Sequence, residues 1–166
     1  MLRPGVLPVT DARPVRVLFL CTRNAARSQI AEAITAHLAA QRAPGQFEVA
    51  SAGSHPGDAV HPLAVAALAE QGIAWGGRRP KSTDAVSGQH WDLVVTVCDH
   101  ANESCPFLPG QRARAHWGLE DPQDLPAFRA TLAELTRRTG ELVALPAAAL
   151  GQDELQRRAQ AIADGA

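Results

Sequence analysis

The 166-residue sequence contains no tyrosine and only three cysteines, and neither sign of charge prevails. Its formal net charge of −1 provides no basic surface of the kind that binds nucleic acid or an anionic membrane. No apolar run approaches the roughly 18 residues that a membrane helix needs. The first 14 residues include three prolines and lack the apolar core of a signal peptide. We therefore expect a cytoplasmic, monomeric protein with no nucleic-acid or membrane partner, and a flexible extension over residues 1–14.

The three cysteines are Cys21, Cys98 and Cys105, and no C-x-x-C pair is present. A set this small and odd in number does not form a disulfide scaffold and is typical of reactive or metal-ligating thiols. One alternative is a metal site built from Cys98, Cys105 and either His90 or His100. Because Cys-x6-Cys is not a usual zinc spacing, we expect no metal and no cofactor.

Nearly continuous apolar segments predict strands that are buried on both faces. They are residues 15–20, 47–53, 91–97 and, more weakly, 112–119. Helical spacing of apolar residues predicts helices at 28–41, 61–72 and 125–145, followed after Pro146 by a short, frayed helix. Strands that alternate with helices favour an α/β fold. We expect one catalytic domain over residues 15–166, a three-layer sandwich with a central four-stranded parallel sheet and helices on both faces.

The segment VLFLCTRNAARSQIAEAI, residues 17–34, places Cys21 at the end of a predicted strand and Ser28 at the start of a predicted helix. A short loop that wraps into a helix N-terminus directs several backbone N–H groups at one point, where the helix dipole adds about half a positive charge. Such a nest binds a tetrahedral oxyanion. Its positive field favours the thiolate of Cys21, and Ser28 either caps the helix or donates a hydrogen bond to that sulfur. The residues expected to contact the oxyanion are Thr22, Arg23, Asn24, Ala25, Ala26 and Arg27, the last through a planar guanidinium that holds two oxygens.

This loop resembles the phosphate-binding loop of the low-molecular-weight protein tyrosine phosphatase superfamily, and the resemblance extends over roughly residues 15–145. It implies that Cys21 is the nucleophile, that Arg27 binds the oxyanion and that Ser28 steadies the thiolate. A displacement at phosphorus or arsenic also needs an acid to protonate the leaving oxygen. In this family the general acid belongs to an Asp-Pro pair late in the chain, which the Asp121–Pro122 pair matches, so the resemblance implies that Asp121 is this acid. A residue before proline is held extended, which gives the carboxylate a fixed direction.

Two further segments, VTVCDHANESCP and HWGLEDP, resemble the thioredoxin-coupled arsenate reductases of this superfamily. The absence of tyrosine agrees, because the phosphatases usually carry aromatic residues around the substrate cleft. The resemblance implies that Cys21 attacks arsenate, that Cys98 attacks Cys21 as arsenite departs, and that Cys105 then attacks Cys98. The resulting Cys98–Cys105 disulfide passes to an external dithiol, with thioredoxin as the expected partner.

The spacing of these two cysteines constrains the segment between them. Residues seven apart in a helix lie about 10.5 Å from each other, whereas a disulfide tolerates only about 7 Å between α-carbons. Residues 98–105 therefore cannot remain one regular helix when oxidised. We expect this segment to loop out, with Pro109 and Gly110 as pivots.

Two other functions remain open: a low-molecular-weight phosphatase that hydrolyses phosphomonoesters, and a non-catalytic anion-binding module in which Cys21 is unreactive. Some reductases of the superfamily bind potassium beside the loop through an Asn, a Glu, a Ser and an Asp. Asn24, Glu32 and Ser51 match the first three, but Lys81 stands where the aspartate is expected. We expect its ammonium to replace the cation, and Asn24 to hold the loop in shape by side-chain hydrogen bonds.

Overall fold

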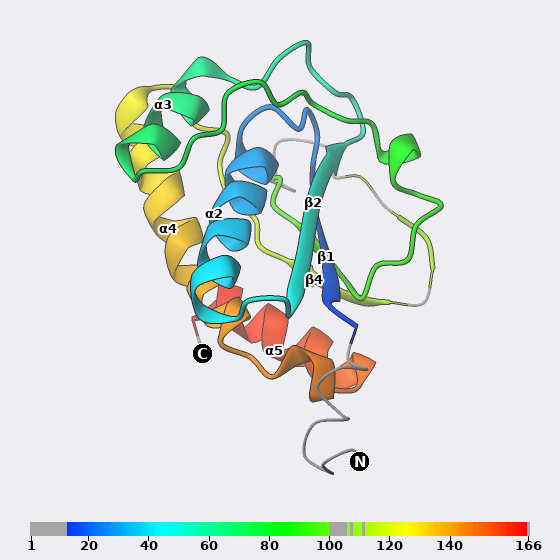
Figure 1. The fold of residues 1–166 in the computed structure, drawn as a ribbon. Coiled ribbons are helices and arrows are strands. Elements are labelled where there is room, and N and C mark those ends of the chain that lie inside the picture. The colour runs from blue at the N-terminus through cyan, green and yellow to red at the C-terminus, as the bar shows by residue number, and fades with distance from the viewer. Residues whose placement is uncertain (1–12, 100–105, 107, 111, 166) are drawn as a thin grey trace, which may run out of the picture.

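A parallel β-sheet forms the centre of the computed structural model, which describes residues 13–99, 106, 108–110 and 112–165 (Figure 1). Its strands are β1 (Val15–Cys21), β2 (Phe47–Gly53), β3 (Leu93–Thr96) and β4 (Ala113–His116), in the spatial order β2-β1-β3-β4. Every pairing is parallel, which confirms the predicted sheet. The last two strands are shorter than predicted, because the buried side chains of Trp91 and Trp117 extend the apolar runs beyond the paired residues.

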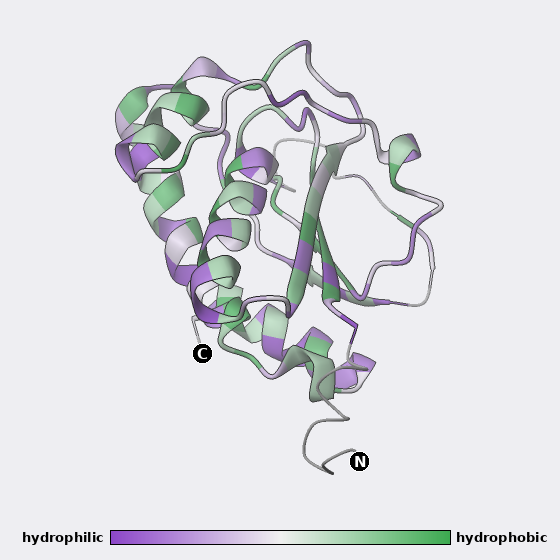
Figure 2. Cartoon of the chain, viewed as in Figure 1, coloured by the Kyte–Doolittle hydropathy of each residue, from purple (hydrophilic) through white to green (hydrophobic). Residues whose placement is uncertain are grey.

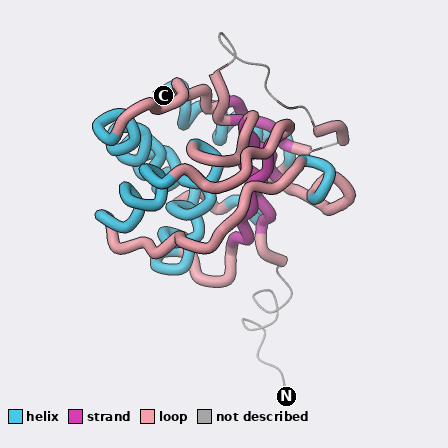
Figure 3. The backbone as a smooth tube through the Cα atoms, turned by 90° about the horizontal axis from the view of Figure 1, so that it is seen from above, coloured by secondary structure: helices cyan, strands magenta, loops and turns pink. Residues whose placement is uncertain are grey.

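Most of the helical structure lies on one face of this sheet (Figures 1 and 3). The helices there are α2 (Arg27–Arg42), α3 (Pro62–Glu70), α4 (Leu125–Val143) and α5 (Gln152–Asp164), and the one-turn helix η2 (Ala147–Ala149) joins the last two. In β1, Val17 and Phe19 pack into the core beneath these helices, whereas Leu18 and Leu20 belong to a second, smaller core. Strands β1, β2 and β3 are accordingly apolar along most of their length (Figure 2), whereas alanine alternates with polar residues in β4.

The opposite face of the sheet has a thinner cover. Among the described residues it consists of the one-turn helix η1 (Thr83–Ala85) and of coil whose buried side chains include Val86, Trp91 and Leu108. The three layers predicted from the sequence are therefore present but unequal.

The C-terminal helix α5 is neither short nor frayed, in contrast to the prediction. Its buried face consists of Leu155, Ala159 and Ile162, and the Trp117 indole N–H donates to the Ala159 carbonyl at 2.8 Å. The Gln160 side chain accepts from the His116 N–H at 2.7 Å and donates to the His116 carbonyl at 3.0 Å. These bonds satisfy the outer edge of β4, which would otherwise present unpaired backbone groups.

The register of the sheet brings the ends of two central strands together. Leu20 pairs with Thr96, and the Val97 N–H donates to the Leu20 carbonyl at 2.8 Å. Cys21 ends β1 and Cys98 lies just beyond the end of β3, so both are at the same edge of the sheet. Both also belong to the same buried cluster. This is the edge at which ligands bind in open α/β sheets.

Some predictions concern residues outside the described part of the chain. These include most of the N-terminal extension, His100 and Cys105. Within the described part, no helix combines the length and the apolar character needed to cross a membrane.

Candidate active site

The loop between β1 and α2 is folded around the sulfur of Cys21. The Asn24 N–H donates to Cys21 Sγ at 3.3 Å. Asn24 has a φ of 51°, and no other non-glycine residue of the described chain has a positive φ. Asparagine tolerates this left-handed conformation better than most residues. The tight turn at Asn24 is what closes the loop on the thiol.

The segment 53–61 braces the loop from outside. Three of its N–H groups donate to loop carbonyls, with His55 bonded to Thr22 at 2.8 Å, Gly57 to Arg23 at 2.9 Å and His61 to Ala25 at 2.8 Å. In a trans peptide the carbonyl and the following N–H point in opposite directions. Carbonyls that face this brace therefore turn the next N–H groups in the loop toward its interior, as binding of an oxyanion requires.

Gly53 is a structural requirement of the loop that the sequence analysis did not identify. A Cβ at this position would lie 2.6 Å from the Thr22 carbonyl oxygen and 2.8 Å from the Asn24 backbone nitrogen. Both neighbours are backbone atoms that cannot rotate away, so only glycine allows β2 to pass this close to the loop.

The Cys21 thiol is free and 2% exposed, with Ser28 Oγ 2.8 Å from its sulfur. Ser28 does not cap α2: the N-cap is Ala26, which makes no side-chain capping bond. Of the two roles open to Ser28, the structure shows the contact with sulfur. Asn24 Nδ2 donates to Ser28 Oγ at 2.8 Å, so the hydroxyl acts as acceptor there and has its own proton for a thiolate.

The side chain of Asn24 ties the loop to its surroundings, as predicted. Its Oδ1 accepts from the Lys81 backbone N–H at 2.8 Å and from Gln29 Nε2 at 3.0 Å. Its Nδ2 also donates to Ser51 Oγ at 2.9 Å. Gln29, which is 2% exposed, is a further member of the site that the sequence analysis missed, because a glutamine in an amphipathic helix gives no signal of its role.

The prediction for Lys81 requires a correction. Its backbone, rather than its ammonium, meets Asn24, and its side chain is exposed. The cation beside Glu32 is Arg78, whose NH1 lies 3.8 Å from Glu32 Oε2. No sequence pattern distinguishes the neighbouring basic residues in RRPK, because the path of this coil depends on tertiary contacts.

Arg27 reaches from the start of α2 to the loop that carries the predicted general acid. Its NH1 donates to the Leu119 carbonyl at 3.0 Å, and its NH2 lies 3.8 Å from Asp121 Oδ1. The Arg27 side chain is 5% exposed, whereas that of Asp121 is 54% exposed. The structure thus places the predicted oxyanion-binding and acidic groups side by side.

A cavity of about 450 Å³ opens over the loop. Cys21, Arg23, Ala25, Ala26 and Arg27 form its floor, while segments 57–62 and 121–123 form its walls. Thr22 and Asn24 are not among the residues that line it. The thiol, the guanidinium and the carboxylate therefore share one solvent-accessible space.

Cys98 is fully buried beyond the end of β3 and takes part in a disulfide. The predicted third thiol, Cys105, and the predicted looping of residues 98–105 lie outside the described residues. Of the two predicted pivots, Gly110 has a φ of 133°, a conformation suited to glycine.

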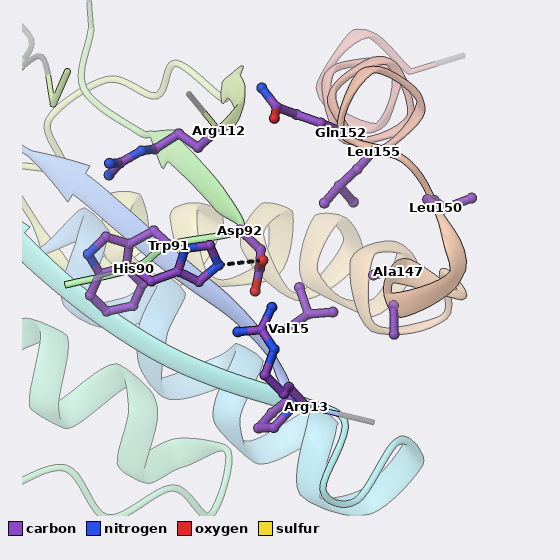
Figure 4. A pocket seen from close by; sticks show the side chains of 12 residues that line it. Arg13, Val15, His90, Trp91, Asp92, Arg112, Ala147, Leu150, Gln152 and Leu155 are labelled. Atoms are coloured by element: carbon purple, nitrogen blue, oxygen red, sulfur yellow. Dashed lines mark hydrogen bonds and ion pairs between the residues drawn. The ribbon is translucent and has the colours of Figure 1, made fainter. Parts of the chain in front are cut away.

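The alternative metal site is not supported by the position of His90. His90 precedes β3, whereas Cys98 follows it, so a whole strand separates them. His90 Nε2 instead lies 2.9 Å from Asp92 Oδ1 in a second cavity of about 310 Å³ (Figure 4). The described residues contain no group of three His, Cys, Asp or Glu side chains placed to hold a metal ion.

The chain belongs to the low molecular weight phosphotyrosine protein phosphatase family, whose pattern matches residues 16–160. An arsenate reductase of Bacillus anthracis is 36% identical over 124 residues, which are 74% of this chain and 89% of that protein. The crystal structure of an arsenate reductase from Archaeoglobus fulgidus is similar with a TM-score of 0.67 and 34% identity, covering 78% of this chain and 99% of that one. A thioredoxin-dependent arsenate reductase from Corynebacterium glutamicum gives a TM-score of 0.61 and 36% identity over 83% of this chain and 65% of that one.

Proposed function

We propose that this protein is an arsenate reductase in which Cys21 is the nucleophile. The observation that carries the proposal is the placement of a second buried thiol position, Cys98, beside Cys21 at the same edge of the sheet. A phosphatase needs the oxyanion loop and the acid but has no use for a neighbouring cysteine. The names of relatives at 34% and 36% identity support the same activity.

In the first step the Cys21 thiolate attacks arsenic and forms a sulfur–arsenic bond. Arg27 and the inward N–H groups of the loop hold the remaining oxygens of arsenate. Asp121 protonates the oxygen that leaves, so that it departs as water. Ser28 donates to the Cys21 sulfur and lowers the energy of the thiolate before attack.

In the second step the Cys98 thiolate attacks Cys21 Sγ. A disulfide forms between the two cysteines while the sulfur–arsenic bond breaks, and its electron pair remains on arsenic, which leaves as arsenite. Two thiols have then been oxidised and arsenic(V) has been reduced to arsenic(III). Cys21 and Cys98 lie at the same edge of the sheet, so this attack joins the ends of two neighbouring strands.

In the third step Cys105 attacks Cys98 and releases Cys21 as a thiolate. The disulfide that remains, between Cys98 and Cys105, is reduced by an external dithiol through thiol exchange. Thioredoxin fits this role, and the description of the Corynebacterium glutamicum neighbour supports it. The participation of Cys98 in a disulfide agrees with such a relay.

A Cys105→Ser variant tests this order of events. It should complete one turnover and accumulate a Cys21–Cys98 disulfide, because the third thiol is missing. Mass spectrometry of non-reduced peptides after treatment with arsenate detects that link. If arsenate produces no Cys21–Cys98 peptide while arsenite is still released continuously, the proposed relay is wrong.

A further inference from the structure

Two arginine side chains line the cavity over the loop, and the proposed reaction uses only one of them. The guanidinium of Arg27 is held by the Leu119 carbonyl at 3.0 Å and lies 3.8 Å from Asp121. Arg23 lines the same cavity and is exposed. Within the described part of the chain, no hydrogen bond or ion pair engages the guanidinium of Arg23. Its N–H groups are therefore available to a ligand in the cavity.

The guanidinium of Arg23 lies against the wall that segment 57–62 forms. A Cβ at Gly57 would lie 3.6 Å from NH2 of Arg23 and 3.7 Å from its Nε, which is ordinary contact distance. The backbones of the two residues are also bonded, because the Gly57 N–H donates to the Arg23 carbonyl at 2.9 Å. The guanidinium is thereby placed where the floor of the cavity meets this wall.

A second hydrogen-bond donor belongs to the same wall. His61 Nδ1 accepts from the Leu63 N–H at 3.0 Å, so the proton of the neutral imidazole is on Nε2. The ring packs against Phe128, with 4.7 Å between the ring centroids. His61 lines the cavity, and the ring nitrogen that it has left for a ligand is a donor.

The cavity is larger than its proposed substrate requires. Its volume of about 450 Å³ lies in the range of sites that hold whole small molecules, about 300–1,000 Å³. One tetrahedral oxyanion in the loop leaves much of this space unfilled. A ligand with an organic arm can therefore place its oxyanion in the loop and the end of its arm against the wall.

The charges that line the cavity are Arg23, Arg27, Asp58 and Asp121. Asp121 lies beside Arg27. Asp58 is exposed on the wall, and within the described residues it forms no ion pair with Arg23. Arg23 is thus the cation of this cavity that has no carboxylate beside it, and its planar guanidinium matches two carboxylate oxygens.

We propose that Arg23 is a specificity-determining residue that binds a second negative charge, carried on the organic arm of an oxyanion ligand. The ligand class is a phosphonate or phosphomonoester whose arm ends in a carboxylate. Its tetrahedral group lies in the loop on Arg27, and its carboxylate lies on Arg23 beside the Nε2–H of His61. The inference rests on the anion-binding role of the loop in the proposed function. It concerns binding alone and involves no thiol chemistry.

The test measures how much a carboxylate on the arm adds to binding. Isothermal titration compares ω-carboxyalkylphosphonates that have one, two or three methylene groups with the carboxamide of each, which has the same shape and no charge on its arm. In the parent protein at least one acid should bind about fivefold more tightly than its amide, the upper effect of an exposed ion pair. High salt should remove this preference.

The ratio of the acid affinity to the amide affinity separates charge recognition from a merely structural role, because both compounds bind through the same phosphonate. Arg23→Gln should bring the ratio close to one, and Arg23→Lys should keep part of the preference. Asp58→Asn should widen it, because an opposing charge is removed from the wall. Arg79→Gln removes an exposed charge that does not line the cavity and should keep the parent ratio.

A ratio near one for every acid in the parent, a preference that survives in Arg23→Gln, or an equal loss in Arg79→Gln would overturn the inference. Titration of phosphate into the parent tests the loop separately. If phosphate binds and no acid is preferred, the proposed function stands and this inference fails. If Arg23 confers the preference but the parent releases no arsenite from arsenate, the proposed function fails and this inference stands.

Discussion

The guanidinium of Arg27 lies 3.8 Å from the carboxylate of Asp121 at the cavity that contains the Cys21 thiol. The pair joins the group proposed to bind the oxyanion with the group proposed to protonate its leaving oxygen. Arg27 is almost fully buried and is anchored by the Leu119 carbonyl, whereas Asp121 faces solvent. An entering oxyanion therefore competes with Asp121 for Arg27 and places the carboxylate beside the oxygen that must leave.

Replacing Asp121 by asparagine should lower kcat for arsenate by about 10²- to 10⁴-fold, the usual contribution of a positioned general acid. The shape of the side chain is kept, and the lost group is the proton donor. Glu120→Gln, an equal change at the exposed preceding residue, is the control and should leave kcat unchanged. Similar losses in both variants would show that local charge, rather than Asp121, supports the reaction.

Replacing Arg27 by lysine should weaken binding of arsenate, phosphate or sulfate by about ten- to a hundredfold, because an ammonium cannot hold two oxygens in one plane. Isothermal titration of phosphate measures this directly. Arg79→Lys makes the same exchange away from the cavity and should not alter the affinity. If the Arg27→Lys protein binds oxyanions and turns over arsenate like the parent, the oxyanion-binding role assigned to Arg27 is wrong.

The sequence was sufficient to predict the sheet and the loop between Cys21 and Ser28 because both depend on local patterns. The buried strand before Cys21, the helix after Ser28 and the Cys-x5-Arg spacing are contiguous in the chain. The prediction of a short, frayed C-terminal helix was wrong because the stability of this helix does not depend on local patterns. Its amphipathic face becomes stable only through tertiary contacts. These include the hydrogen bond from the Trp117 indole to the Ala159 carbonyl and the two bonds between Gln160 and the His116 backbone.

The support around Asn24 was only partly predictable for a similar reason. The motif identified Asn24 as a residue that holds the loop, and the bonds to Ser28 and Ser51 agree. Gln29 and Trp75 join the same network across 46 positions of sequence. A contact between residues so distant leaves no periodic or motif signal. The position of Trp75 in turn places Arg78, rather than Lys81, near Glu32.

Replacing Gly53 by alanine should destabilise the fold by about 1–3 kcal/mol, the usual cost of forcing an extra methyl into a packed site. The added carbon would meet the backbone of Thr22 and Asn24, so oxyanion affinity should fall as well. Urea unfolding and phosphate titration report the two effects. At Gly88 an added Cβ meets nothing within 4 Å, and Gly88→Ala should leave both quantities near the parent values.

Replacing Gln160 by alanine should lower the free energy of unfolding by about 1 kcal/mol, because two bonds to the backbone of His116 are lost at a partly hydrated edge. Gln41→Ala, on the exposed surface of α2, is the matched control. Arsenate turnover well below the melting temperature should be unchanged in both. A loss of turnover in Gln160→Ala without loss of stability would assign α5 a role that the packing does not indicate.

The central claim is that the Cys98 thiolate attacks the Cys21 sulfur of the arsenic adduct and thereby reduces arsenic. Steady release of arsenite in the presence of thioredoxin, thioredoxin reductase and NADPH, measured beside phosphatase activity in the parent and in Cys98→Ser, tests it most directly. The parent should release arsenite continuously, and Cys98→Ser should release none while keeping any weak phosphatase activity, since that needs only Cys21, Arg27 and Asp121. A parent protein that is an efficient phosphatase, releases no thioredoxin-dependent arsenite and is indifferent to Cys98→Ser would contradict the account.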